Sequence, residues 1–142
     1  MRSLVAILVF TAACGAKPAL TTPTGEAIPF DKLDHDQRIE FMKQKVVPQM
    51  KPIFQMHDSK KFAEFGCTTC HGEQAKDGHF DMPNAKLPKL NFNDMSKFKK
   101  EDIDWMKEQV LPTMARILDQ PVHSQENPKG FGCLECHTQE GQ

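Results

Sequence analysis

Two stretches of the chain carry apolar residues at the spacing of an amphipathic helix. Near every third or fourth position an apolar side chain recurs, which places one hydrophobic face on each stretch. These faces consist of Phe41, Val46, Met50, Ile53 and Phe54 in the first stretch and of Trp105, Val110, Met114, Ile117 and Leu118 in the second. No segment has the clear pattern of a strand. The sequence therefore predicts a mostly α fold without significant sheet.

The two helical stretches are copies of one unit. Residues 41–53 match residues 105–117 at an offset of 64, and six of the thirteen positions are identical. Further along, the segment 65–67 matches 131–133 at an offset of 66, so the second copy has two extra residues after its helix. Such internal similarity indicates a duplicated supersecondary unit. We expect two pseudo-symmetric helix-turn-helix units, at about 34–72 and 95–138.

The ends of these helices have recognisable signals. Asp34 or Asp36 is a candidate N-cap for the first helix, and Asp94 or Ser96 for the second, because short polar side chains accept hydrogen bonds from the free N–H groups of a first turn. Each unit should also carry a second, short helix.

Prolines mark the interior of both helices and the segment between the units. Pro48 and Pro112 each remove one backbone donor, which predicts a kink or the start of a new helical segment. The connector, residues 73–94, contains further prolines with several Asn and Lys residues. We expect it to be irregular and to lie over the surface.

A Cys-x-x-Cys-His pentad follows each helix, at residues 67–71 and 133–137. This is the attachment sequence for c-type haem, in which two thiols bond to the porphyrin and the histidine ligates the iron. The two pentads therefore predict two covalently bound haems. The expected attachment residues are Cys67, Cys70, Cys133 and Cys136, and the expected proximal iron ligands are His71 and His137. A zinc site or a redox dithiol is the alternative, since Cys-x-x-Cys alone serves both.

Composition agrees with a cofactor-bearing domain. Only 39% of the 142 residues are hydrophobic, so a core made of side chains alone would be thin. Two porphyrins would add large apolar faces. The formal charge is −1 and no basic block is present, which argues against a nucleic-acid partner.

The amino terminus has the pattern of an export signal. Residues 1–13 contain one Arg, a short apolar run and small residues just before Cys14. This resembles a bacterial lipobox, which implies a lipoprotein signal peptide and lipidation of Cys14. Residues 14–30 are then expected to be a tether and residues 31–142 a diheme domain. The expected location is the bacterial cell envelope, lipid-anchored and facing the periplasm, with the choice of membrane open.

Two repeated pairs compete for the distal side of the irons. Met50 and Met114 lie on the apolar helix faces, and a thioether ligand there would raise the reduction potential. His57 and His123 both lie ten residues before the first pentad cysteine, but in polar segments that look like exposed turns. Because a helix holds a side chain more rigidly than a turn, we favour the methionines and keep the histidines as the alternative.

The combination of a Met-bearing helix, a turn and a Cys-x-x-Cys-His segment, repeated behind a lipidated amino terminus, resembles the cytochrome c subunit of photosynthetic reaction centres. In that family the axial methionine lies on the helix before each pentad, which implies Met50 and Met114 here. The family has four haem segments and this chain has two. The resemblance thus implies a free-standing diheme relative.

These observations predict a one-electron carrier of a respiratory or photosynthetic chain. Its partners would be a redox protein donor and acceptor, membrane complexes among them. No catalytic carboxylate pair or nucleophile constellation is visible, which favours a carrier over an enzyme. The alternative is a small diheme enzyme or sensor with an open axial site, of the peroxidase or gas-binding kind.

Overall fold

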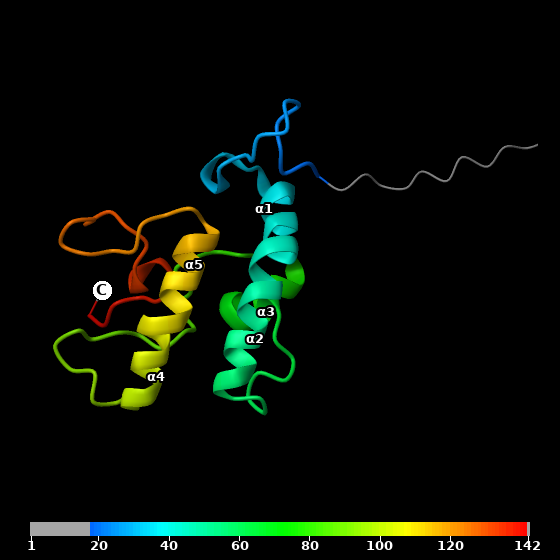
Figure 1. Ribbon diagram of the computed structural model, residues 1–142. Helices are drawn as coiled ribbons and strands as arrows, with labels where there is room; N and C mark the ends of the chain where they lie inside the picture. The colour runs from blue at the N-terminus through cyan, green and yellow to red at the C-terminus, as the bar shows by residue number, and fades with distance from the viewer. Residues whose placement is uncertain (1–17, 142) are drawn as a thin grey trace, which may run out of the picture.

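Two long helices lie side by side and run in opposite directions (Figure 1). They belong to a computed structural model that describes residues 18–141. The first long helix is made of α1 (His35–Phe41), the π turn η2 (Met42–Val46) and α2 (Val47–His57). The second is made of α4 (Lys100–Trp105), the π turn η4 (Met106–Val110) and α5 (Leu111–Ile117). The helices meet where α2 contacts η4 and where α5 contacts η2.

The π turns lie directly before the two prolines. In each, an N–H bonds to the carbonyl five residues back, from Val47 to Met42 and from Leu111 to Met106. A new α segment then begins at Val47 and Leu111, one residue before Pro48 and Pro112. Because proline cannot donate to the carbonyl four residues back, widening the preceding turn lets the helix continue past it. Of the two outcomes predicted for each proline, a kink or a new helical segment, the structure has the new segment.

Only the first of the two long helices begins at a predicted N-cap residue. The Asp34 carboxylate accepts the Gln37 N–H at 2.8 Å, and the Gln37 side chain accepts the Asp34 N–H at 3.0 Å, which is a capping box. The second helix instead begins after Lys99, without a side-chain cap. Asp94 accepts the Ser96 N–H within a local turn, at 3.0 Å. The prediction that one of these two residues caps the helix is wrong, because they stabilise a turn that ends before it.

The remaining elements are short. They are the 3-10 turns η1 (Phe30–Lys32), η3 (Glu73–Asp77) and η5 (Cys133–Glu135), and the helix α3 (Cys67–His71). Within residues 18–141 the only strand-like pairings are isolated bridges, so the mostly helical fold without sheet is confirmed. None of the helices in this range is both long and apolar enough to cross a membrane.

The connector is irregular beyond η3, as expected, but it does not stay on the surface. Asn84 and Leu90 are buried, at 4% and 7% exposure. Leu90 donates its N–H to the carbonyl of Thr138 and accepts the N–H of Glu140, both at 2.9 Å. These bonds hold the connector against the carboxyl-terminal segment.

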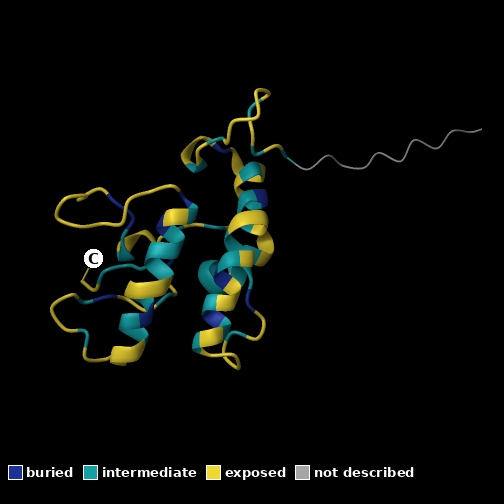
Figure 2. Ribbon diagram, in the orientation of Figure 1, coloured by how far each residue is buried: buried dark blue, intermediate teal, exposed yellow. Residues whose placement is uncertain are grey.

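Two small clusters of buried side chains hold the helices together. The first core cluster consists of Met50, Phe54, Phe65 and Trp105, and the second core cluster consists of Ala115, Leu118 and Phe131. Figure 2 shows how few positions are buried, in short stretches along the helices and loops. No large side chain of the described residues falls below 2% exposure. The core is therefore thin, as the composition predicted.

Phe54 lies at the centre of the first core cluster. Its ring centroid is 4.8 Å from those of Phe65 and Trp105 and 4.9 Å from that of Phe62. We expect Phe54→Ala to lower the free energy of unfolding by about 3–5 kcal/mol, since it leaves a cavity among these rings. Denaturant titration followed by circular dichroism measures the change. Met56→Ala, on the same helix but 83% exposed, is the control and should cost less than about 0.5 kcal/mol. Equal losses in both variants would contradict this assignment.

Candidate functional site

The first pentad forms the helix α3 and is fixed by the residues before it. Phe65 is buried against Phe54 of α2. Gly66 donates its N–H to the hydroxyl of Thr69 at 3.1 Å, which closes the first turn. The predicted short helix is confirmed for this pentad, and its start is anchored to the first long helix.

The second pentad begins with the single 3-10 turn η5 (Cys133–Glu135), so the short helix expected there is reduced to this turn. The buried Phe131 pairs with the loop after α5, since its N–H donates to Pro121 at 2.8 Å and its carbonyl accepts the N–H of His123 at 2.9 Å. This extended pairing runs up to the pentad and is followed at once by η5. One α-type bond, from the His137 N–H to the Cys133 carbonyl at 2.9 Å, closes the segment.

One connector residue brings the two pentads together. The side-chain amide of Asn84 donates to the carbonyl of Cys70 at 2.9 Å, and its backbone N–H donates to the carbonyl of Cys136 at 2.9 Å. The second cysteine of each pentad therefore lies beside the same buried residue.

The thiols of these two cysteines are shielded from solvent. Burial raises the pKa of the Cys70 thiol to about 11, and the neighbouring Cys67 adds to the effect. Burial is also the main reason why the pKa of the Cys136 thiol is raised to about 12, and the neighbouring Cys70 adds to it. Both groups are protonated at neutral pH.

Alkylation tests the state of these thiols before any cofactor is attached. The raised pKa values reduce the thiolate fraction at pH 8, so iodoacetamide should modify Cys70 about 100-fold and Cys136 about 1000-fold more slowly in the folded chain than in denaturant. Their rates should keep rising above pH 9, because the thiolate forms only as the pH approaches the raised pKa. Peptide mass spectrometry measures both rates. Rapid native alkylation that levels off near pH 9 would contradict the prediction.

Neither pentad has enough further ligands beside it for a zinc site. Across residues 18–141, no group of three or more His, Cys, Asp or Glu side chains is placed to hold a metal ion. Zinc in structural sites takes four such ligands. A c-type haem makes a different demand, because the pentad itself supplies both thioether bonds and one axial imidazole.

His137 has a defined orientation. Its Nδ1 lies 2.9 Å from the carbonyl oxygen of Pro88 in the connector. A carbonyl only accepts, so Nδ1 carries the proton and donates, which leaves the lone pair of the neutral ring on Nε2. This is the arrangement in which a histidine ligates a metal while its other nitrogen is held by the protein.

His71 is held in a different way. Burial lowers the pKa of its imidazole, an effect that the backbone of Phe80 partly offsets. The approach of Phe80 falls short of a hydrogen bond, and Nδ1 is buried without a partner among the described residues. The Phe80 ring meets the imidazole edge to face at a centroid distance of 5.3 Å. The ring of His71 is thus positioned by packing.

The two candidate methionines lie near the pentads. Met50 belongs to the first core cluster with Phe65, two residues before the first pentad. Met114 is half-buried and packs against both clusters, and Cys136 packs against the second. Met50 therefore shares a cluster with Phe65, which anchors the first pentad. Met114 shares a cluster with Cys136 of the second pentad.

The two candidate histidines have unlike surroundings. His57 ends α2, half-buried, so its expected place in an exposed turn is wrong. Its Nε2 lies 2.7 Å from the Asp102 carboxylate, and its ring stacks on Trp105 with a centroid distance of 4.0 Å. His123 is exposed, as expected, and its Nδ1 lies 3.1 Å from the carbonyl of Pro128. His57 thus links the two long helices.

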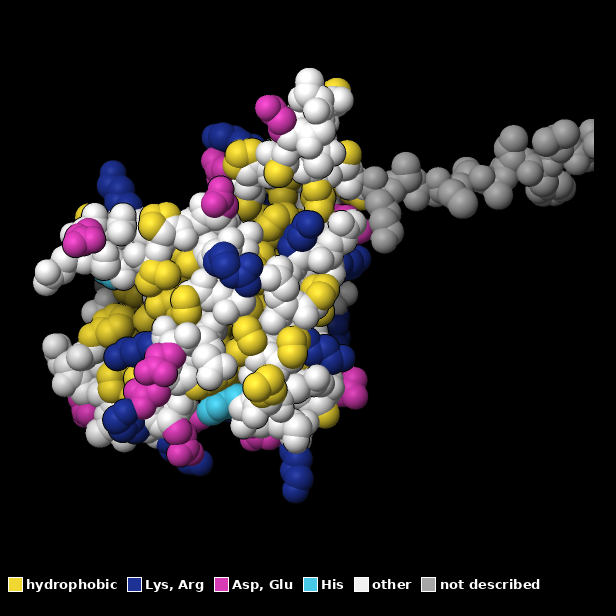
Figure 3. Space-filling view, in the orientation of Figure 1, with side chains coloured by type: hydrophobic (Ala, Val, Ile, Leu, Met, Phe, Trp, Pro, Cys, Tyr) yellow, Lys and Arg dark blue, Asp and Glu magenta, His cyan; other side chains and the backbone are white. Residues whose placement is uncertain are grey.

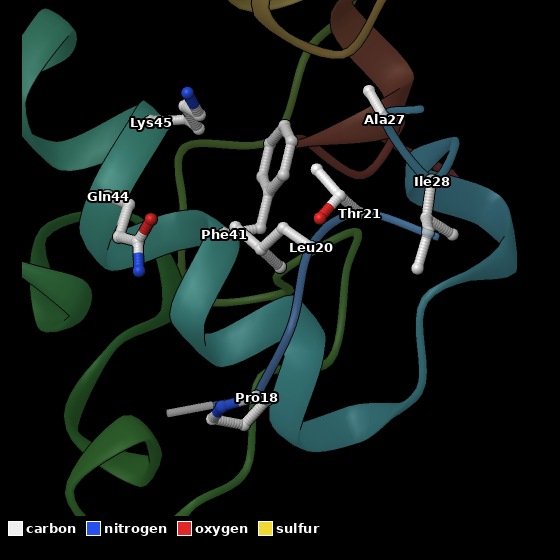
Figure 4. A pocket seen from close by; sticks show the side chains of 8 residues that line it. All are labelled: Pro18, Leu20, Thr21, Ala27, Ile28, Phe41, Gln44 and Lys45. Carbon is white, nitrogen blue, oxygen red and sulfur yellow. The ribbon is translucent and has the colours of Figure 1, made fainter. Parts of the chain in front are cut away.

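His35, His79 and Cys14 have no counterpart in the repeated units. His35 and His79 are exposed, and Cys14 with the signal segment lies outside the described residues. From residue 18 the expected tether forms a small turn, in which the Ile28 N–H donates to Leu20 at 3.0 Å. This turn and the first helix enclose a hollow of about 320 Å³ (Figure 4), lined by Pro18, Leu20, Thr21, Ala27, Ile28, Phe41, Gln44 and Lys45. No pentad residue lines it.

Sequence reasoning missed Asn84, Pro88 and Asp102. Each acts through a contact across at least 14 residues, and none lies in a repeated motif. No family model, curated protein or solved structure matches this chain, so its likeness to reaction-centre cytochromes remains a prediction from the sequence.

Proposed function

We propose that this protein is a diheme c-type cytochrome that carries single electrons. The observation that carries the proposal is the meeting of two Cys-x-x-Cys-His pentads at Asn84, with His137 already oriented by Pro88. The thin core supports it, because two porphyrins would supply the missing apolar contact. Figure 3 shows hydrophobic side chains exposed along the seam between the long helices and in a hollow between the loop after α5 and the connector.

Each part of the chain has a role in this proposal. Cys67 and Cys70 would hold one haem, Cys133 and Cys136 the other, and His71 and His137 would ligate the irons. A bound haem supplies one-electron oxidation and reduction at its iron. The protein holds the ligands in place, excludes water and tunes the potential through burial.

The pairing of the two units, the membrane anchor and the redox partners are parts of the same proposal. The reciprocal contacts between the π turns and the α segments support a pseudo-symmetric pair of units. A lipid on Cys14 would anchor the domain to the bacterial envelope, facing the periplasm. The donor and acceptor would then be redox proteins at or near that membrane.

The test is to produce the full chain in a bacterium that attaches c-type haem. We expect two haems per chain by the pyridine haemochrome assay, two reversible one-electron steps in a redox titration and no rapid binding of carbon monoxide after reduction. A chain without covalent haem would overturn the proposal. Two haems with rapid carbon monoxide binding at one of them would favour the open-site enzyme or sensor instead.

A further inference from the structure

Asn84 is a buried polar residue that belongs to neither repeated unit. It lies in the connector and is 4% exposed. Its polar groups are nevertheless engaged: Oδ1 accepts the N–H of Lys86 at 2.9 Å, and its carbonyl accepts the N–H of Leu87 at 3.0 Å. Buried polar groups are costly unless bonded, so these bonds fix the conformation of Asn84 itself.

The remaining donors of Asn84 face the two pentads. Its backbone N–H bonds to Cys136 and its side-chain amide to Cys70. On the side of the second pentad, the connector makes further bonds through Pro88 and Leu90. The connector is therefore attached to the second pentad at several points, and the Asn84 amide ties the first pentad to it.

The end of the first pentad leaves space for this amide. Gly72, directly after His71, has a φ of +76°, a conformation that other residues rarely adopt. A Cβ at this position would lie 3.4 Å from Nδ2 of Asn84 and 2.9 Å from Oε1 of Gln74. The chain therefore turns away from α3 where the Asn84 side chain approaches it.

We infer that Asn84 is a positioning residue that sets the relative placement, and so the electronic coupling, of the two haems. The inference rests on the proposed function. Since each porphyrin would be bonded to its pentad, a shift of Cys70 relative to Cys136 moves one porphyrin relative to the other. The Asn84 amide opposes that shift.

The test compares three variants with the wild-type holoprotein. Asn84→Asp keeps the shape and the acceptor of Asn84 but has no amide donor for Cys70, and Asn84→Ala removes the side chain. Asn93→Ala, at an exposed position nearby, is the control. We expect all to keep two haems. The two-signed Soret circular dichroism signal of a coupled haem pair should fall about twofold or more in both Asn84 variants, because the amide bond that ties Cys70 to the connector is lost and the two pentads can shift relative to one another. The spacing of the two reduction potentials should change with it.

A second measurement works without haem. In the Cys67→Ala/Cys133→Ala background, a short bifunctional thiol reagent should cross-link Cys70 to Cys136. Asn84→Ala should lower the ratio of cross-linked to singly modified chain about twofold or more, a ratio that does not depend on how readily either thiol reacts. Unchanged Soret coupling with two haems bound, or an unchanged ratio of cross-linked to singly modified chain, would overturn the role of Asn84 and leave the proposed function standing. A wild-type chain without haem would overturn the proposed function and the haem-positioning role together. If a variant loses haem, the cross-linking ratio decides.

Discussion

A chain in which Cys133 and Cys136 are both replaced by Ala should carry one covalent haem in place of two. Cys67→Ala/Cys70→Ala should have the same effect on the other site, and the fourfold variant should carry none. The reason is that, in the proposed function, each pentad would supply both attachment bonds for its own haem. This is the largest effect that we expect, because each double variant would remove one of the two proposed haems and with it one of the two redox steps.

The structure supports independent loss of the two sites. Phe65 anchors the first pentad in the first core cluster, and Phe131 anchors the second pentad in the second core cluster. Alanine at one pair of cysteines leaves the other anchor in place. Haem content per chain, by pyridine haemochrome and by mass spectrometry of the intact protein, measures the outcome.

Cys14→Ala is the matched control for these variants. It removes the fifth cysteine, which lies outside both pentads, and should leave two haems per chain while releasing the protein from the membrane fraction. Loss of both haems from a single pair variant would contradict independent attachment. Retention of two haems in the fourfold variant would exclude the pentads as attachment sites.

Local signals predicted the elements of this fold well. The period of the apolar residues located both long helices, and Asp34, one of two candidate N-caps, marked the start of the first. These features depend on neighbours within one turn, which a sequence displays directly. The start of the second helix was missed, because Asp94 and Ser96 form a turn whose end the sequence does not mark.

Contacts across the fold could not be predicted in the same way. The repeat suggested equal roles for His57 and His123, yet His57 binds Asp102 of the other helix and His123 bonds within its own loop. Two residues at the same distance from their pentads along the chain can still have different neighbours in the folded protein. Asn84 is the stronger example, since its role comes from two carbonyls that only the folded chain brings together.

Mutagenesis can identify which side chains would be the distal ligands of the proposed haems. Met50→Leu and Met114→Leu should each convert one haem to a lower potential, because a thioether ligand raises the potential and leucine keeps the volume of the side chain without its sulfur. The fall should be a substantial part of the roughly 0.8 V range that axial ligands span in haem proteins. Each variant should also lose part of the weak absorption at the red end of the visible spectrum and bind carbon monoxide at the vacated iron.

Two controls separate ligation from packing. Met56→Leu, on the same helix as Met50 but exposed, should leave both potentials and the spectrum unchanged. His57→Gln should weaken the link to Asp102 and Trp105, lowering stability by about 1–3 kcal/mol without a change of ligand. If His57→Gln or His123→Gln opens an iron to carbon monoxide while both methionine variants leave the irons closed, the histidines are the distal ligands. His57 would then have to leave Asp102 when haem binds, and the two long helices would lose their bond at that end.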